Sequence, residues 1–180
     1  YELKMMAMLG DDSNDDKERT ILNRTIKWKD HYIEYEADAK HVEEIFKYLD
    51  LDDDSKGLDW PIIKEDKDEI SKDDPELPMT QVTEYRGLAA RANYLSLDRF
   101  DIQYAAKEVC RDMSTPRVSS MSKMKRLARY LLEHPRQVLV FRPCEVVDSP
   151  IVVYTDSDWA GCHRIRKSTS GGMLFFEGGC

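Results

Sequence analysis

The stretch that decides the fold class is Ile151-Val152-Val153-Tyr154-Thr155-Asp156-Ser157-Asp158-Trp159-Ala160-Gly161, near the end of the 180-residue chain. Its β-branched and aromatic residues predict a buried β-strand. The strand stops at Asp156, and Asp158 follows two residues later. A rigid strand end that is open to solvent is a position from which a carboxylate can hold a divalent metal ion. The alternative is a structural role, because aspartates also bond to their own backbone in turns.

A basic loop and a second apolar run follow this strand. The loop contains Arg164, Arg166 and Lys167, and the run Met173-Leu174-Phe175-Phe176 predicts an antiparallel return strand. The pair Cys162-His163 is too isolated for a zinc site, because such sites normally have four ligands. This end of the chain therefore predicts a β-hairpin with carboxylates near its turn.

The composition favours an intracellular protein without a membrane span. Hydrophobic residues make up 41% of the chain, and no apolar run approaches the roughly 20 residues of a membrane helix. The four cysteines show neither a metal-binding nor a disulfide spacing, which favours a reducing compartment. Tyr1 is not an initiator methionine, and the segment Glu177–Cys180 breaks off just after a predicted strand. We therefore expect a piece of a longer polypeptide.

Charge is distributed unevenly along the chain. Residues 1–78 contain 12 lysines and arginines against 24 aspartates and glutamates, and residues 79–180 contain 15 against 11. The first part therefore has a net charge of −12 and the second of +4, within a total of −8. A polyanion would meet the second part, although so small an excess does not by itself predict nucleic-acid binding.

Residues 1–50 predict a hairpin followed by a helix. The two strands are expected at Ile21–Trp28 and Tyr32–Tyr35, with a short connection at Lys29–His31. Asp38 is a candidate N-cap for the helix. The helix itself is indicated by apolar residues at helical spacing, namely Val42, Ile45, Phe46 and Leu49.

Residues 51–78 predict a charged linker punctuated by prolines. Its acidic residues favour a solvated connection over an acidic binding site. Within it, Trp60–Ile63 could attach the linker to a neighbouring element.

Residues 79–135 predict a small bundle of three amphipathic helices. Thr80, Asp98 and one of Ser119 or Ser120 are the expected helix starts, and Pro116 and Pro135 are expected to end the second and third helices. The three apolar stripes are Tyr85, Leu88, Ala89, Ala92 and Leu95; Ile102, Ala105, Ala106, Val109 and Met113; and Met121, Met124, Leu127, Ala128 and Leu131.

The third predicted helix carries a basic face. Its polar surface holds Lys123, Lys125, Arg126 and Arg129. Such a face could lie along a phosphate backbone, because basic side chains bind duplexes by neutralising phosphates. The alternative is an ordinary solvated surface. After this helix, residues 137–141 predict a strand and residues 142–150 a loop.

Several ordered motifs together resemble the pol polyprotein of copia-type LTR retrotransposons, at the junction of reverse transcriptase and ribonuclease H. The motifs are Tyr85-Arg86-Gly87-Leu88, Arg91-Ala92-Asn93-Tyr94-Leu95, Asp98-Arg99-Phe100-Asp101-Ile102-Gln103-Tyr104-Ala105, Met113-Ser114-Thr115-Pro116, Lys125-Arg126-Leu127-Ala128-Arg129-Tyr130-Leu131, Tyr154-Thr155-Asp156-Ser157-Asp158-Trp159-Ala160-Gly161 and Arg166-Lys167-Ser168-Thr169-Ser170-Gly171-Gly172. The chain departs from the family at Phe100, where a proline is usual, and at Met121, where a tryptophan is usual.

The resemblance implies an α+β organisation in four parts. Residues 1–50 look like the end of the polymerase palm, and residues 51–78 are the acidic linker. Residues 79–135 look like the thumb or connection helices, which hold a primer–template duplex or RNA–DNA hybrid. Residues 136–180 look like the first strands of an incomplete ribonuclease H-like α/β domain.

The resemblance also implies roles for single residues. Asp156 matches the first of four carboxylates that hold two magnesium ions, whereas Asp158, Gly161, Ser170 and Gly171 are expected to shape the loop. The nucleic-acid-binding candidates are Lys125, Arg126, Arg129, Arg166 and Lys167. The polymerase motif Tyr-x-Asp-Asp does not occur in the chain, and the other three carboxylates would lie beyond it.

The chain is therefore expected to be inactive by itself and to work with the remainder of the polyprotein, in a cytoplasmic particle or the nucleus. The alternative is a non-catalytic, decayed or co-opted module that binds a protein.

Overall fold

The computed structural model describes residues 8–52, 54–62, 74–142, 151–162 and 166–176. Within these residues, four α-helices, one 3-10 helix and six strands form two sheets and a helical cluster, so the predicted α+β class is confirmed. The chain divides into two compact units. One unit contains residues 1–19, 26–35 and 139–180, and the other, the helical unit, contains residues 20–25 and 36–138.

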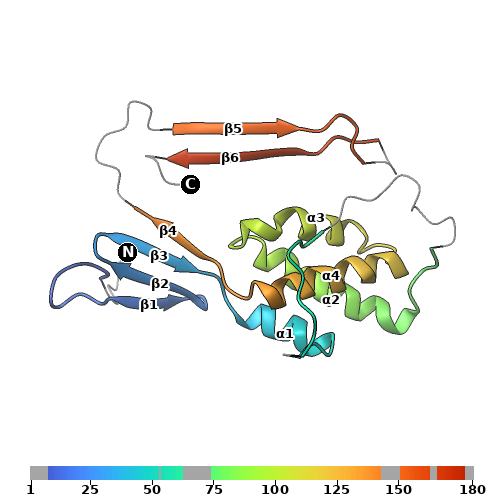
Figure 1. The fold of residues 1–180 in the computed structure, drawn as a ribbon, viewed down its shortest axis with the longest axis horizontal. Helices are drawn as coiled ribbons and strands as arrows, with labels where there is room; N and C mark the ends of the chain where they lie inside the picture. Colours follow the sequence, from blue (N-terminus) through green and yellow to red (C-terminus); the bar gives the residue numbers. More distant parts are fainter. Residues whose placement is uncertain (1–7, 53, 63–73, 143–150, 163–165, 177–180) are drawn as a thin grey trace, which may run out of the picture. The chain divides into compact units, whose positions relative to one another are not determined.

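The first sheet has the strand order β1-β2-β3-β4 (Figure 1). Its strands are β1 (Glu18–Ile21), β2 (Arg24–Lys29), β3 (Tyr32–Glu36) and β4 (Val138–Phe141). The prediction of one continuous strand over residues 21–28 is wrong. Leu22 and Asn23 have φ angles of 51° and 62°, so they form a two-residue turn between β1 and β2. Such turns require positive φ at both positions.

The second sheet is the hairpin that the sequence predicts. Strands β5 (Ile151–Ser157) and β6 (Ser170–Phe176) pair antiparallel. The expected burial of the first strand is wrong, because all seven residues of β5 are exposed. A two-stranded ribbon has no further layer over its faces, so apolar side chains remain in contact with solvent. The expected ribonuclease H-like part, residues 136–180, includes β4, whereas the strand order places β4 in the other sheet.

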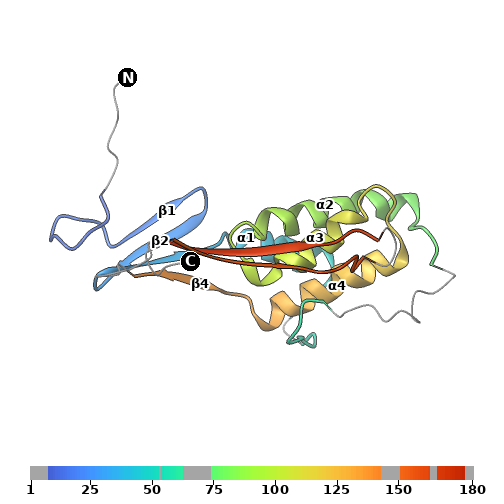
Figure 2. The same cartoon turned by 90° about the horizontal axis from the view of Figure 1, so that it is seen from above.

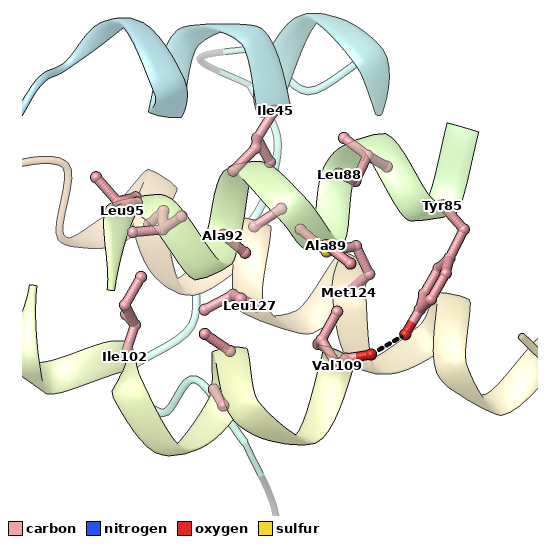
Figure 3. Packing of buried hydrophobic residues seen from close by; sticks show 14 of the residues in the cluster. Ile45, Tyr85, Leu88, Ala89, Ala92, Leu95, Ile102, Val109, Met124 and Leu127 are labelled. Carbon is pink, nitrogen blue, oxygen red and sulfur yellow. Dashed lines mark hydrogen bonds between the residues drawn. The ribbon is translucent and has the colours of Figure 1, made fainter. Parts of the chain in front are cut away.

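The helical unit is built from α1 (Lys40–Tyr48), α2 (Met79–Leu95), α3 (Gln103–Arg111) and α4 (Val118–Glu133) (Figure 2). A 3-10 helix, η1 (Phe100–Ile102), precedes α3. The helices enclose one apolar core (Figure 3). The predicted stripes point into this core, except that Phe46, Leu49, Met113 and Met121 are only partly buried. The buried stripe residues are Val42, Ile45, Tyr85, Leu88, Ala89, Ala92, Leu95, Ile102, Ala105, Ala106, Val109, Met124, Leu127, Ala128 and Leu131.

The predicted helix starts are correct only in part. The Asp38 carboxylate accepts the Lys40 N–H at 2.9 Å, although the N-cap position itself is Ala39. Thr80 lies inside α2, whose N-cap is Pro78. Asp98 is not the N-cap either, because Arg99 occupies that position before η1; the Asp98 carboxylate accepts a hydrogen bond from the Arg24 Nε at 2.7 Å. A distant partner therefore takes the carboxylate that the local pattern assigns to the helix.

The linker is attached to the helical unit at several points, so its prediction as a solvated connection is wrong for these parts. Leu77 is buried, and Ile62 packs against the core. Trp60 is 71% exposed and therefore does not anchor the segment. The last residue of the predicted attachment, Ile63, lies outside the described residues.

We expect Leu127→Ala to lower the free energy of unfolding of the helical unit by about 3 kcal/mol, because it removes a fully buried side chain and leaves a cavity. Leu97→Ala is the matched control, because Leu97 is 68% exposed. Urea unfolding followed by the helical circular dichroism signal measures both effects. An equal loss in the two variants would contradict the core position of Leu127.

Candidate nucleic-acid interface and carboxylate hairpin

The linker fixes the beginning of α4. The Asp74 carboxylate accepts the Ser119 backbone N–H at 3.0 Å and the Ser119 hydroxyl at 2.6 Å. Arg117 also donates from its guanidinium to the Asp74 carbonyl at 2.5 Å. Burial by itself would raise the pKa of Asp74, but the bonds from Ser119 and the charge of Arg117 hold it below the usual value. An anion at a helix N-terminus is favourable because free N–H groups point towards it.

A second carboxylate supports the same end of α4 from the end of α3. Asp112 is 7% exposed, and it accepts the Ser120 hydroxyl at 3.0 Å. The Ser120 oxygen in turn accepts the Arg117 N–H at 3.0 Å, which completes part of a capping box. The Lys123 Nζ lies 3.8 Å from the Asp112 Oδ2, so this member of the predicted basic face is ion-paired.

A buried arginine closes the other end of α4. The Arg99 side chain is 2% exposed and forms a two-pronged ion pair with Asp101, with distances of 2.9 and 2.7 Å. The same guanidinium donates to the carbonyls of His134 and Pro135 at 2.9 and 3.3 Å. A cation at a helix C-terminus satisfies carbonyls that have no partner within the helix.

Asp101 is also bound from α4 itself, because the Tyr130 hydroxyl donates to its carboxylate at 2.9 Å. Burial by itself would raise the pKa of Asp101. The hydrogen bonds and charge of Arg99, together with the Tyr130 bond, outweigh burial and lower it below the ordinary value. The carboxylate is therefore held in its ionised form.

The predicted basic face lies on the helix that these two networks hold. Lys125 is exposed, and it lies one helical turn from Arg129 on the same side of α4. Within the described residues, the buried Nε of Arg126 has no hydrogen-bond partner. The Nε of Arg129 donates to the Lys56 carbonyl at 2.6 Å. The structure thus brings Lys125, Arg126 and Arg129 together, but the linker backbone occupies part of the face.

The candidate carboxylate lies on the hairpin, where Asp156 is exposed and pairs with Gly171. Ser170, at the start of β6, pairs with Ser157.

Asp158 has a different environment, because its carboxylate accepts the backbone N–H groups of Thr169 and Gly161 at 2.5 and 3.4 Å. A Cβ at Gly161 would approach the Asp158 oxygen to 2.2 Å. The Asp158 carboxylate thus bonds to the backbone of its own loop.

The basic loop beside this hairpin is partly described. Arg166 and Lys167 are both exposed. The Arg166 N–H donates to the Cys162 carbonyl at 2.7 Å, and the Cys162 N–H donates to the Lys167 carbonyl at 3.2 Å. His163 and Arg164 lie outside the described residues. The hairpin and α4 belong to different units, and each carries its own candidate site.

The described residues do not by themselves fit a magnesium site. Among them, no group of three or more histidine, cysteine, aspartate or glutamate side chains is positioned to hold a metal ion. Mg²⁺ is usually bound through carboxylates together with water and substrate oxygens. A single hairpin carboxylate such as Asp156 is therefore an incomplete ligand set.

Sequence reasoning missed two features that shape the α4 face. The first is the burial of Arg99, because arginines are usually exposed; the nearby Asp101 is the signal that could have indicated a pair. The second is the contact of Lys56 with Arg129, which are 73 residues apart. A backbone acceptor has no sequence signature, so no pattern predicts this contact.

Comparison with known proteins points to transposons. An uncharacterized mitochondrial protein of Arabidopsis thaliana is 33% identical over 98 residues, which is 54% of this chain and 39% of that protein. The retrovirus-related Pol polyproteins from transposons RE1 and RE2 of the same plant are 31% and 30% identical over 97 and 93 residues. These matches cover 54% and 52% of this chain.

About half of the chain is similar to transposon Pol polyproteins. The matched part spans 6% of each of these two polyproteins, so the chain corresponds to a small piece of them. No protein-family profile and no solved structure matches the chain. In the described part of the chain, no helix is both long and apolar enough to cross a membrane.

We expect Asp101→Asn to cost about 3 kcal/mol of unfolding free energy at neutral pH, because it leaves the buried Arg99 without its counter-charge. Because the pKa of Asp101 is lowered by folding, its ionised carboxylate stabilises the fold at pH values above the usual pKa of 3.8. This contribution is lost as the pH falls through the lowered pKa. The difference between wild type and variant should therefore shrink in acid. Urea unfolding across this pH range measures it.

The exposed Asp12 supplies the control variant, Asp12→Asn, which should change the unfolding free energy little at any pH. If the difference in unfolding free energy between wild type and Asp101→Asn does not change with pH, the ionised carboxylate is not the source of the stability.

Proposed function

We propose that this chain is a piece of a copia-type retrotransposon polyprotein, from the junction of its reverse transcriptase and ribonuclease H. In this proposal, the helical unit holds the RNA–DNA hybrid or primer–template duplex by its backbone, and α4 provides the contact surface. The observation that carries the proposal is the basic face of α4, on a helix that polar networks hold at both ends. The similarity to transposon Pol polyproteins supports the context.

The physical argument rests on spacing and pre-organisation. Lys125 and Arg129 lie four residues apart, so both can face one strand of a duplex. A helix that does not move on binding loses little conformational entropy, which favours affinity. Each phosphate that these side chains neutralise releases counterions from the duplex.

The proposed role of Asp156 is to supply one metal ligand to a larger ribonuclease site. A magnesium ion held there would supply Lewis-acid and nucleophile-generating chemistry for RNA cleavage. Because the described residues lack a cluster of three ligands, the remainder of the polyprotein would have to contribute the others. The setting of this reaction would be intracellular.

We expect Lys125→Ala together with Arg126→Ala to weaken binding of an RNA–DNA hybrid about tenfold at moderate salt. The plot of log affinity against log salt concentration should become shallower by about two, because two phosphate contacts are lost. Fluorescence anisotropy with a labelled hybrid, measured at several salt concentrations, tests both effects. These substitutions leave Arg129 and its contact with the linker in place.

Lys40→Ala together with Lys47→Ala is the matched control, because it removes the same charge from exposed positions on α1. A loss of affinity that is equal in the two double variants would mean that net charge, rather than the face of α4, determines binding. Binding by the wild type that does not depend on salt would exclude phosphate contacts altogether.

The purified chain should not cleave a hybrid, because its described residues supply an incomplete ligand set. Incubation of a labelled RNA–DNA hybrid with the chain and excess Mg²⁺, followed by gel analysis, measures the reaction. The proposal for Asp156 would be wrong in its present form if the chain cleaved RNA and Asp156→Asn abolished that cleavage, because the chain would then contain a complete site.

A second candidate function is a protein-interaction module. It is favoured by apolar side chains that remain exposed around η1, where Leu97 is 68%, Phe100 45% and Tyr104 52% exposed. Association through such side chains would change little with salt, whereas phosphate contacts weaken steeply as salt is added. The salt titration above therefore separates the two functions.

A further inference from the structure

A segment of the linker lies across the basic face of α4. We call residues 54–62 the strap; it is the teal segment that follows α1 in Figure 1. Asp50, with a φ of 50°, follows the C-cap residue of α1, Leu49, and the Leu51 N–H then donates back to the Phe46 carbonyl at 3.0 Å. The chain therefore leaves α1 in a defined direction before the strap begins.

The strap contacts α4 through its backbone. The Lys56 carbonyl accepts the Nε of Arg129 at 2.6 Å, and the Leu58 N–H donates to the Arg129 carbonyl at 3.1 Å. Between these two bonds, Gly57 lies directly against Glu133. A Cβ at position 57 would be 2.1 Å from the Glu133 Oε2 and 2.9 Å from its Cβ. The approach thus depends on the missing side chain of Gly57.

The rest of the strap makes few buried contacts. Ile62 packs against the core, but Trp60 is 71% exposed and Asp54 and Asp59 are also exposed. A segment with few buried contacts opens locally at low free-energy cost. The strap is therefore both in place in the free protein and readily displaced.

The position of the strap matters because Arg129 is one of the three cations of the proposed binding face. A guanidinium that donates its Nε to a backbone carbonyl has fewer N–H groups left for a phosphate. The strap also brings Asp54 and Asp59 into the neighbourhood of this helix, and these charges repel a polyanion. Both effects act against duplex binding.

We propose that the strap is autoinhibitory: it competes with duplex phosphates for Arg129, and a bound duplex displaces it from α4. This inference rests on the proposed duplex binding by the same face. The strap would then set a threshold for binding, because a short or weakly charged ligand gains too few phosphate contacts to displace it.

Gly57→Ala tests the proposal, and Gly87→Ala is its matched control. A Cβ at position 57 collides with Glu133, whereas a Cβ at position 87 meets nothing within 4 Å. We expect Gly57→Ala to raise the affinity for an RNA–DNA hybrid about fivefold and to steepen the salt dependence by about one phosphate contact. Gly87→Ala should leave both values unchanged.

Hydrogen exchange reports the strap directly. In the free wild type, the Leu58 amide should be protected by its bond to Arg129. Protection of the peptide that contains residues 54–62 should fall in Gly57→Ala, and in the wild type when saturating hybrid is added. It should stay unchanged in Gly87→Ala.

A charge variant separates release of the strap from misfolding. Asp50→Asn, Asp54→Asn and Asp59→Asn together remove three acidic charges in or beside the strap without steric conflict and should raise affinity. The control triple, Asp30→Asn, Glu43→Gln and Glu84→Gln, changes net charge equally at exposed positions elsewhere, and its gain should be smaller.

The outcomes distinguish this inference from the function on which it rests. If the wild type binds hybrid but Gly57→Ala loses strap protection without gaining affinity, the strap is not inhibitory and duplex binding still holds. Protection that stays unchanged when hybrid binds would also overturn the inference. If neither the wild type nor Gly57→Ala binds hybrid, both proposals are wrong.

Discussion

The buried guanidinium of Arg99 is the interaction on which the helical unit depends most. It is the bulkiest fully buried side chain among the described residues, and a buried charge is tolerable only when it is paired and its hydrogen bonds are satisfied. Asp101 supplies the charge, and the two carbonyls after α4 each accept a further N–H group. One side chain thus connects η1 to the C-terminal end of α4, and so fixes where the basic face of that helix lies.

The linker plays a corresponding part at the other end of α4. Asp74 binds the N-terminal turn, while the strap crosses the helix near Arg129. The same connection therefore positions the candidate binding helix and restricts access to one of its cations. This dual role follows from geometry, since the chain must return from α1 to α2 and runs over α4 in doing so. The affinity of the face is then a balance between the strap and a competing polyanion.

The apolar stripes show how far sequence patterns reach. The stripe through Leu88 and Ala92 and the stripe through Leu127 and Leu131 were predicted from 3.6-residue spacing and are buried, because an amphipathic helix has one low-energy way to face a core. The positions of turns and caps were predicted less well. Leu22–Asn23 breaks an expected strand, and Asp98 pairs with Arg24 instead of capping a helix. At Asp98 a local preference competes with a contact that is distant in sequence.

The sequence by itself determined the helices, the hairpin that carries Asp156, and the cations of α4, because these depend on periodicity and residue type within a short window. Only the tertiary structure decided that Arg99 is buried, that Lys123 is paired with Asp112, and that the Lys56 carbonyl accepts a hydrogen bond from Arg129. These contacts join residues whose approach depends on how whole elements pack, and the strap uses a backbone carbonyl that every residue possesses. For that reason a pattern of side chains can indicate a binding face but not whether the chain itself already covers it.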